Sequence, residues 1–187
     1  MIKSISLTLF LVVFISACRI DGNDTVGQEE LNFSTTDDSE IFFKNVRQLY
    51  YDLEEIQAAN LNVFRIKERS VSEDYPVINL AIVWNWLKDE AYILIEPNEI
   101  LIEEDPLVVH WRSPVSGEEG IIEYSQGNTM AQLTFANELY NGILNNYTFE
   151  IISNGLSEPL LQANKDREAF RKTMADYFRL TRTFDQR

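Results

Sequence analysis

The stretch "VINLAIVWNWL", residues 77–87, constrains the fold more than any other part of this sequence. From position 78 every second residue is large and apolar: Ile78, Leu80, Ile82, Trp84 and Trp86. A period of two places these five side chains on one face of a β-strand. Because such a face is stable only when it is removed from water, we expect another layer of structure to cover it.

Other segments show strand or helix periodicity. Strands are predicted at 61–67, 91–96, 107–113, 120–125 and 147–152. Helices are predicted over 40–59, from Thr129 to Leu144 and over 165–181, where apolar residues recur every three or four positions. Thr129 and Gln132 fit a capping box at the start of the second helix.

The order of these elements predicts an α+β fold for residues 39–187. We expect a single domain with a mostly antiparallel sheet of about five to six strands and three helices, which are N-terminal, central and C-terminal. The length suffices for one sizeable core. The last helix is expected to bury one apolar face, made of Ala169, Phe170, Met174, Tyr177 and Phe178.

The first 18 residues carry a different pattern. Lys3 precedes an apolar run over 7–15 that a single threonine interrupts, and Ser16, Ala17 and Cys18 follow. A positive start, a short apolar core and small residues are typical of a secretory signal. The run is about half the ~20 residues that a membrane-spanning helix needs. The tetrapeptide "ISAC", residues 15–18, resembles the lipobox of bacterial lipoproteins.

The resemblance implies an anchor at Cys18. Residues 1–17 would be a signal peptide, cut before Cys18, whose thiol receives a diacylglyceryl group. Two or more acyl chains attach a protein stably to a bilayer. In this family an aspartate after the cysteine often marks inner-membrane retention, so Arg19 favours the outer membrane. We therefore expect a lipid-anchored protein of the bacterial cell envelope; an ordinary signal peptide with an incidental cysteine is the alternative.

Residues 18–38 are predicted to be the lipidated cysteine and a flexible tether. They contain "DGNDTVGQEE" and "STTDD" and few large apolar side chains. Such a composition buries too little apolar surface to offset the entropy lost on ordering.

The charge of the chain restricts its partners. The net charge is −14, and removing residues 1–17 would take away only Lys3, which gives −15. Nucleic acid would repel such a protein, so no nucleic-acid partner is expected. The acidic excess favours a cationic protein partner, although solubility explains it equally well.

Signatures of catalysis are missing from the sequence. It has one histidine, which rules out the motifs that hold a metal through several histidines. A lipidated Cys18 is no free nucleophile, and G-x-S-x-G, the Walker loop and G-x-G-x-x-G do not occur. We predict a protein that is not an enzyme and needs no cofactor. A Ser-His-Asp site assembled from distant residues stays open.

His110 is the single most interesting side chain for chemistry. If strands 107–113 and 120–125 pair with Arg112 opposite Ile121, His110 faces Glu123. That pair would be sensitive to pH or catalytic. The alternative, which we favour, is an exposed cross-strand pair that contributes roughly 0.2–1 kcal/mol.

Neither a metal site nor a sugar site is predicted from the sequence. The acidic stretch 96–106 offers carboxylates of the kind that bind calcium, but its central apolar residues favour a short element with solvated charges, so no metal site is predicted. Sugars stack on exposed aromatic rings, but Trp84, Trp86 and Trp111 each follow an apolar alternation and are expected in the core.

The function expected from these observations is that of a non-enzymatic, lipid-anchored envelope protein whose domain binds another molecule, with a protein as the expected partner. One alternative is an inhibitor or immunity-type protein that neutralises a basic enzyme. The other is a hydrolase acting on envelope polymers.

Overall fold

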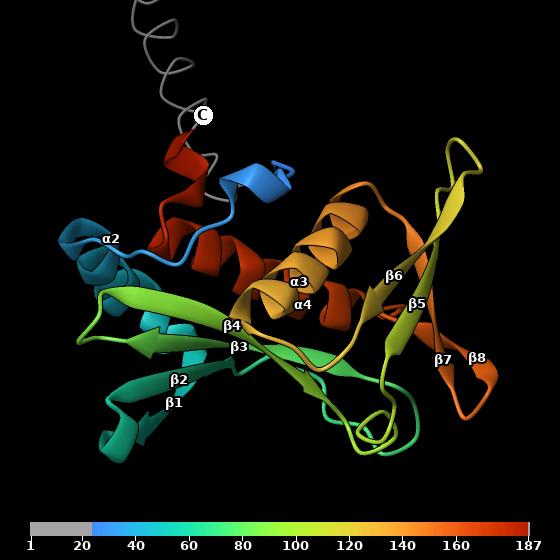
Figure 1. The fold of residues 1–187 in the computed structure, drawn as a ribbon, viewed down its shortest axis with the longest axis horizontal. Helices are drawn as coiled ribbons and strands as arrows, with labels where there is room; N and C mark the ends of the chain where they lie inside the picture. Colours follow the sequence, from blue (N-terminus) through green and yellow to red (C-terminus); the bar gives the residue numbers. More distant parts are fainter. Residues whose placement is uncertain (1–23, 187) are drawn as a thin grey trace, which may run out of the picture.

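The computed structural model describes residues 24–186, which contain two four-stranded antiparallel sheets (Figure 1). The first contains, in spatial order, β1 (Tyr51–Ile56), β2 (Leu61–Ile66), β3 (Ile78–Asn85) and β4 (Glu90–Pro97). The second contains, in spatial order, β6 (Glu119–Tyr124), β5 (Leu107–Arg112), β7 (Thr148–Ser153) and β8 (Leu156–Leu160). The α+β class is thus confirmed. The prediction of one sheet with five to six strands is wrong, because the strands divide into two sheets.

Two long helices join the sheets into one domain. Helix α3 (Thr129–Leu144) packs against β4 of the first sheet and β6 of the second, and α4 (Asn164–Leu180) packs against β3, β4 and α3. Their apolar faces are buried as predicted, including Leu133, Leu139 and Tyr140 on α3 and Phe170, Met174 and Phe178 on α4. Both sheets turn one face toward this shared core.

The alternation at 77–87 buries the face that the sequence predicts, with one exception. Ile78, Leu80, Ile82 and Trp84 are buried on β3, where Ile82 lies between Phe64 of β2 and Ile93 of β4. Trp86 follows the last residue of the strand and is 47% exposed. There the Asn85 side chain accepts a hydrogen bond from the Leu87 amide and the chain turns, so the alternation ends.

The start of α3 differs from the predicted capping box. Asn128, not Thr129, is the N-cap residue, and its side-chain oxygen accepts a hydrogen bond from the Ala131 amide at 3.0 Å. The side chain of Gln132 instead accepts a hydrogen bond from the Ile95 amide, also at 3.0 Å. Gln132 therefore satisfies a backbone donor on the free edge of β4.

The predicted helix over 40–59 is wrong in its second half. The segment begins with α2 (Asp37–Phe42), continues through a π-helical turn, η3 (Phe43–Arg47), and a 3₁₀ turn, η4 (Gln48–Tyr50), and then becomes β1. Residues 51–56 pair along their whole length with β2. This pairing overrides the local helical spacing, because it satisfies backbone groups and buries Tyr51.

A buried ionic cluster attaches this segment to α4. Asp176 is fully buried; Arg47 donates to both its oxygens, at 2.7 and 2.9 Å, and Arg179 donates at 3.0 Å. The Tyr51 hydroxyl donates to the same carboxylate at 2.7 Å. Burial and the neighbouring Asp176 carboxylate raise the pKa of Tyr51 well above its ordinary value. Tyr51 therefore stays a hydrogen-bond donor at neutral pH.

Residues 24–38 pack on the domain, so the prediction of a flexible tether over 18–38 is wrong for its described part. Val26 and Leu31 are 2% and 9% exposed, and the 3₁₀ turn η2 (Gln28–Glu30) lies between them. Phe33 accepts a hydrogen bond from Ala91, and Thr35 donates to Asp89. These bonds extend the β4 edge, which compensates for the few apolar side chains of the segment.

Strand β8 was not predicted. Asn154 and Gly155 have φ angles of 50° and 75°, the left-handed pair that a two-residue hairpin turn requires. Pro159, which has no backbone N–H, lies in the strand that follows. It is tolerated because β8 is at the edge of the sheet.

Candidate binding face

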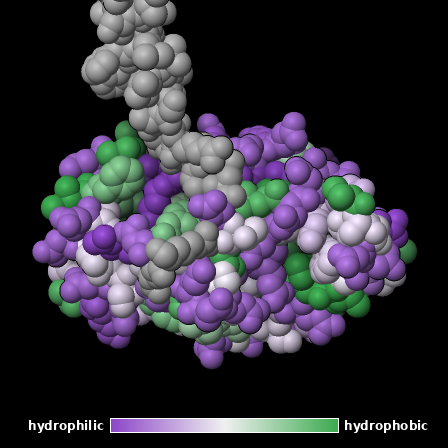
Figure 2. All heavy atoms as spheres, turned by 90° about the horizontal axis from the view of Figure 1, so that it is seen from above, coloured by the Kyte–Doolittle hydropathy of each residue, from purple (hydrophilic) through white to green (hydrophobic). Residues whose placement is uncertain are grey.

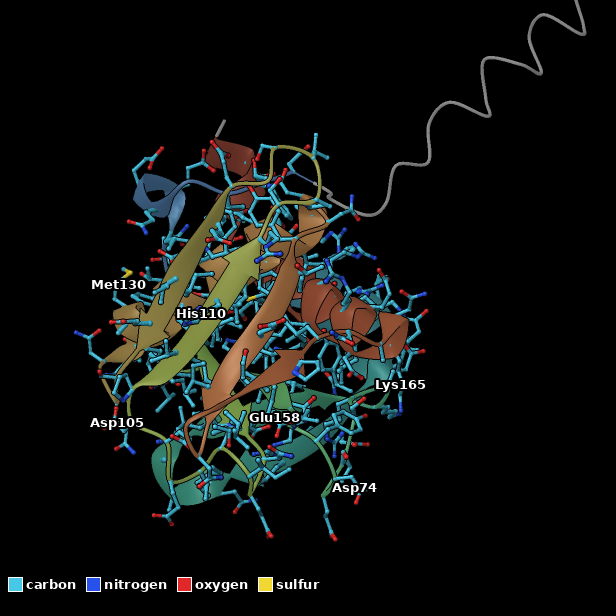
Figure 3. The ribbon with its side chains drawn as sticks, turned by 90° about the vertical axis from the view of Figure 1, so that its right-hand side faces the viewer. Asp74, Asp105, His110, Met130, Glu158 and Lys165 are labelled. Atoms are coloured by element: carbon cyan, nitrogen blue, oxygen red, sulfur yellow. The ribbon has the colours of Figure 1, made fainter. Side chains whose placement is uncertain are left out.

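The outer face of the second sheet carries His110. In Figure 3, which looks onto this sheet, the strands stand in front of the helices and no helix covers them. The outward residues of β5, namely Val108, His110 and Arg112, are half-buried or exposed, whereas Leu107 and Val109 face the core. The sheet is therefore covered on one side only.

The predicted partner of His110 is wrong, because the register of the β5–β6 hairpin differs by two residues along β6. His110 lies opposite Ile121, and Glu123 lies opposite Val108. The turn between β5 and β6 is shorter than predicted. The Ser113 amide donates a hydrogen bond to the Glu118 carbonyl at 2.8 Å, and Gly117 adopts a φ of 73°. On its other side, His110 lies opposite Glu150 of β7. The carboxylate beside the histidine thus comes from a strand that was predicted, but not as a neighbour of the strand that carries His110.

A hollow of about 530 Å³ occupies this face. Its lining includes His110, Arg112, Glu119, Ile121, Thr148 and Glu150. Ile121 is 56% exposed on the edge strand β6, opposite His110. The hollow is thus an open surface on three neighbouring strands, where an exposed apolar side chain lies beside charged groups.

The end of β5 is held by an aromatic stack. Trp111 lies face to face with Tyr147, with ring centroids 4.7 Å apart and an interplanar angle of 10°. A Cβ atom at Gly120 would be 2.8 Å from the Trp111 indole, so only glycine fits there. Trp111 is half-buried, and this packing supports the strands that form the hollow.

The face carries more acidic than basic side chains. Its strands place Glu119, Glu123 and Glu150 on the same side as His110, together with one basic residue, Arg112. Arg112 pairs with Glu119 at 3.2 Å, and both side chains are largely exposed. Within residues 24–186, neither Glu123 nor Glu150 has a Lys or Arg partner. The hollow therefore presents negative charge to an incoming partner.

The geometry differs from that of a Ser-His-carboxylate site. Such a site places the histidine between the hydroxyl and the carboxylate. Here the Ser157 hydroxyl donates directly to Glu150 at 2.6 Å, and Thr148 donates to the Arg112 carbonyl at 3.4 Å. In the part of the chain that the structure describes, no hydroxyl is held against His110.

The other residues considered in the sequence are dispersed. Cys18 lies outside the described residues. In the acidic stretch, Glu96 pairs with Arg65, Glu104 accepts from the Asn154 amide and Asp105 accepts from the Gln126 amide. Between residues 24 and 186, no three His, Cys, Asp or Glu side chains are grouped as metal ligands.

Sequence reasoning missed Glu150 as a member of the face. Glu150 comes from β7, whose neighbour in the sheet is β5 rather than β6. No signal in the sequence specifies that order. Ile121 lies on the outer face in the predicted register as well, because the observed register differs by two residues and moves it from Arg112 to His110.

No protein family, curated protein or solved structure matches this chain. Among residues 24–186, every helix is too short or too polar to cross a bilayer. The candidate face must therefore be interpreted from its own residues.

Proposed function

We propose that this protein is a non-enzymatic binding module of the bacterial cell envelope, anchored by lipid at Cys18, and that the outer face of the second sheet is its binding face. The observation that carries the proposal is the uncovered hollow in which exposed Ile121 lies with Glu119 and Glu150, while Glu123 follows two residues further along β6. Exposed apolar side chains next to charged groups are typical of protein interfaces.

The partner that fits this face is a cationic protein. Lys or Arg side chains of a partner would meet Glu123 and Glu150, which have no basic partner among the described residues. Charge of this kind accelerates association and excludes acidic competitors. The most specific form of the proposal is an inhibitor or immunity-type protein that occupies a basic enzyme at the cell surface.

The binding face is tested by crosslinking in intact cells. A photo-reactive residue replaces Ile121 in one variant and Val71 in another; Val71 is 87% exposed and lies outside the second sheet. The proposal predicts that position 121 captures one protein of basic isoelectric point and that position 71 does not. Equal capture at both positions, or capture of an acidic protein at 121, would contradict it.

Charge-reversal variants then test the complementarity. Glu123→Lys combined with Glu150→Lys should slow association with the captured partner at least about tenfold, and the salt dependence should weaken. Glu73→Lys combined with Asp74→Lys makes the same change of charge on an exposed loop and should leave association unchanged.

The anchor needs a separate experiment. Cells fed a clickable fatty acid should label the wild-type protein, and Cys18→Ser should abolish the label. An unlabelled wild-type protein would remove the lipid anchor from the proposal and leave the binding face untouched. A hydrolase remains the competing function; turnover of envelope polymers that His110→Ala abolishes would favour it over the binding module.

A further inference from the structure

The turns β1–β2 and β3–β4 lie at the opposite end of the molecule from the second sheet (Figure 1). A second hollow is lined by residues of these turns and their neighbours. Its volume is about 430 Å³. The residues that carry the argument are Lys44, Gln57, Asn60, Asn62, Trp84 and Trp86. They come from η3, from the 3₁₀ turn η5 (Gln57–Ala59) and the adjoining start of β2, and from the end of β3 with the turn after it.

The two tryptophans of this hollow have different roles. Trp84 is 1% exposed, and the Lys44 ammonium lies 4.4 Å from the centre of its ring, which is a cation–π contact. Trp86 is 47% exposed. Because the chain turns directly after Asn85, the indole of Trp86 lines the hollow instead of entering the core. Trp86 is therefore available to a ligand.

The amides of the hollow are not used by the fold. Among the described residues, the side chains of Gln57, Asn60 and Asn62 make no hydrogen bond, whereas those of Asn79, Asn85 and others hold backbone groups. Asn60 has a φ of 55°, a conformation that the turn requires and that presents its side chain beside the hollow. Each amide offers donors and an acceptor to a ligand.

We propose that this hollow binds a neutral, hexose-based glycan. A hexose has an apolar face of C–H groups, which packs on an exposed indole, and a rim of hydroxyls, each both donor and acceptor. Trp86 supplies the apolar surface, and Gln57, Asn60 and Asn62 supply matching donors and acceptors. Glu55 and Lys44 lie at the same hollow and can bond further hydroxyls, while their opposite charges leave it without a strong preference for a charged ligand.

This site is independent of the proposed protein-binding face. The two hollows are built on different sheets and share no residue. The domain would bind a protein partner through the face of the second sheet and a glycan at its other end. Loss of one should leave the other intact.

Ligand-observed NMR with unlabelled oligosaccharides tests the proposal. The probes are trisaccharides of glucose, N-acetylglucosamine, galactose and mannose, each mixed with the purified chain from residue 19 onward. We expect saturation transfer to at least one trisaccharide and a dissociation constant of about 1 mM or lower. Binding should also shift the tryptophan emission to shorter wavelength, because it removes Trp86 from water. Failure of all four probes at about 5 mM would overturn the proposal.

Three variants locate the binding. Trp86→Ala should weaken it at least about tenfold, because the stacking surface is lost. Asn60→Gly removes one amide while glycine keeps the left-handed backbone, and it should weaken binding about fivefold. Leu87→Ala removes the neighbouring exposed side chain, which is 60% exposed and does not line the hollow, and should leave binding unchanged. Equal affinity of the Trp86 and Leu87 variants, with melting temperatures unchanged, would place the sugar elsewhere and refute the site.

Discussion

The outer faces of the two sheets differ in whether their carboxylates are paired with basic side chains. On the first sheet, Arg65 lies between Glu54 and Glu96, at 2.6 and 2.7 Å, and Arg69 pairs with Asp52 at 2.7 Å. On the second sheet, Arg112 pairs with Glu119, and Glu123 and Glu150 have no basic partner among the described residues. Asp52, Glu54 and Glu96 of the first sheet are thus neutralised within the fold, whereas Glu123 and Glu150 of the second sheet are not.

This difference shows that the outer face of the second sheet carries carboxylates that the fold does not neutralise. A chain with a net charge of −14 repels itself most where its carboxylates are unpaired. On the second sheet, the unpaired carboxylates lie on the face that also contains the hollow and an exposed isoleucine. Elsewhere, as Figure 2 shows from above, polar residues predominate and apolar residues form separate patches. We therefore expect a partner to bind at the outer face of the second sheet.

The largest expected effect concerns the buried charge cluster beside the first sheet. Asp176→Ala should lower the free energy of unfolding by about 3–5 kcal/mol, because Arg47 and Arg179 lose their common carboxylate and Tyr51 its acceptor. Urea denaturation followed by circular dichroism measures the change. Asp185→Ala, which breaks an exposed pair with Arg182, should cost less than about 1 kcal/mol. Similar losses in the two variants would show that the cluster is not a structural anchor.

A matched pair of isoleucines compares the two sheets directly. Ile82 on the first sheet is fully buried, and Ile121 on the second is 56% exposed. Ile82→Ala should destabilise by about 2–5 kcal/mol through lost burial and a cavity, and Ile121→Ala by about 0.5 kcal/mol or less. The same urea titrations decide this. A loss above about 2 kcal/mol for Ile121→Ala would mean that the outer face of the second sheet is part of the core and not a binding surface.

Alkaline pH should lower the free energy of unfolding, because the pKa of Tyr51 is raised in the native state. Its folded-state pKa lies well above the ordinary value of about 10, so the native state keeps a proton that the unfolded chain releases. The stabilisation is complete below pH ~10 and is lost as the pH rises above it, at up to about 1.4 kcal/mol per pH unit. Buried Tyr177 shifts in the same direction. Tyr51→Phe should therefore reduce the slope between pH ~10 and ~11 by about one proton without removing it. An unchanged slope would contradict this role.

The smallest expected effect is the most direct test of the comparison. Glu54→Gln breaks a pair with Arg65 and should destabilise by about 0.5 kcal/mol, an effect that salt reduces. Glu123→Gln removes an unpaired charge from an acidic face and should be neutral or stabilising by a few tenths of a kcal/mol. Thermal melts at low and high ionic strength separate the two. Destabilisation by Glu123→Gln would indicate a structural partner for that carboxylate and weaken the case for a binding face.

Much of the architecture could be predicted because local periodicity reports burial. The strands β2 to β7, the helix α3 and the helix α4 were expected close to their observed bounds. In each, the apolar side chains meet the core at the period of the element. The candidate face was predicted only in part: His110 was identified, but its neighbours depended on a hairpin register and a strand order that the residues do not encode locally.

The sequence by itself determined the fold class, the buried faces of β3 and α4 and the acidic character of the chain, because each follows from residues close together or from composition. The tertiary structure alone decided that residues 51–56 form a strand, that residues 24–36 pack on the domain, that Glu150 lies beside His110 and that Trp86 is exposed. Each of these depends on which distant backbone or side chain satisfies a hydrogen bond or covers an apolar group. That choice is made among all competing contacts of the chain, and a pattern within one segment does not specify it.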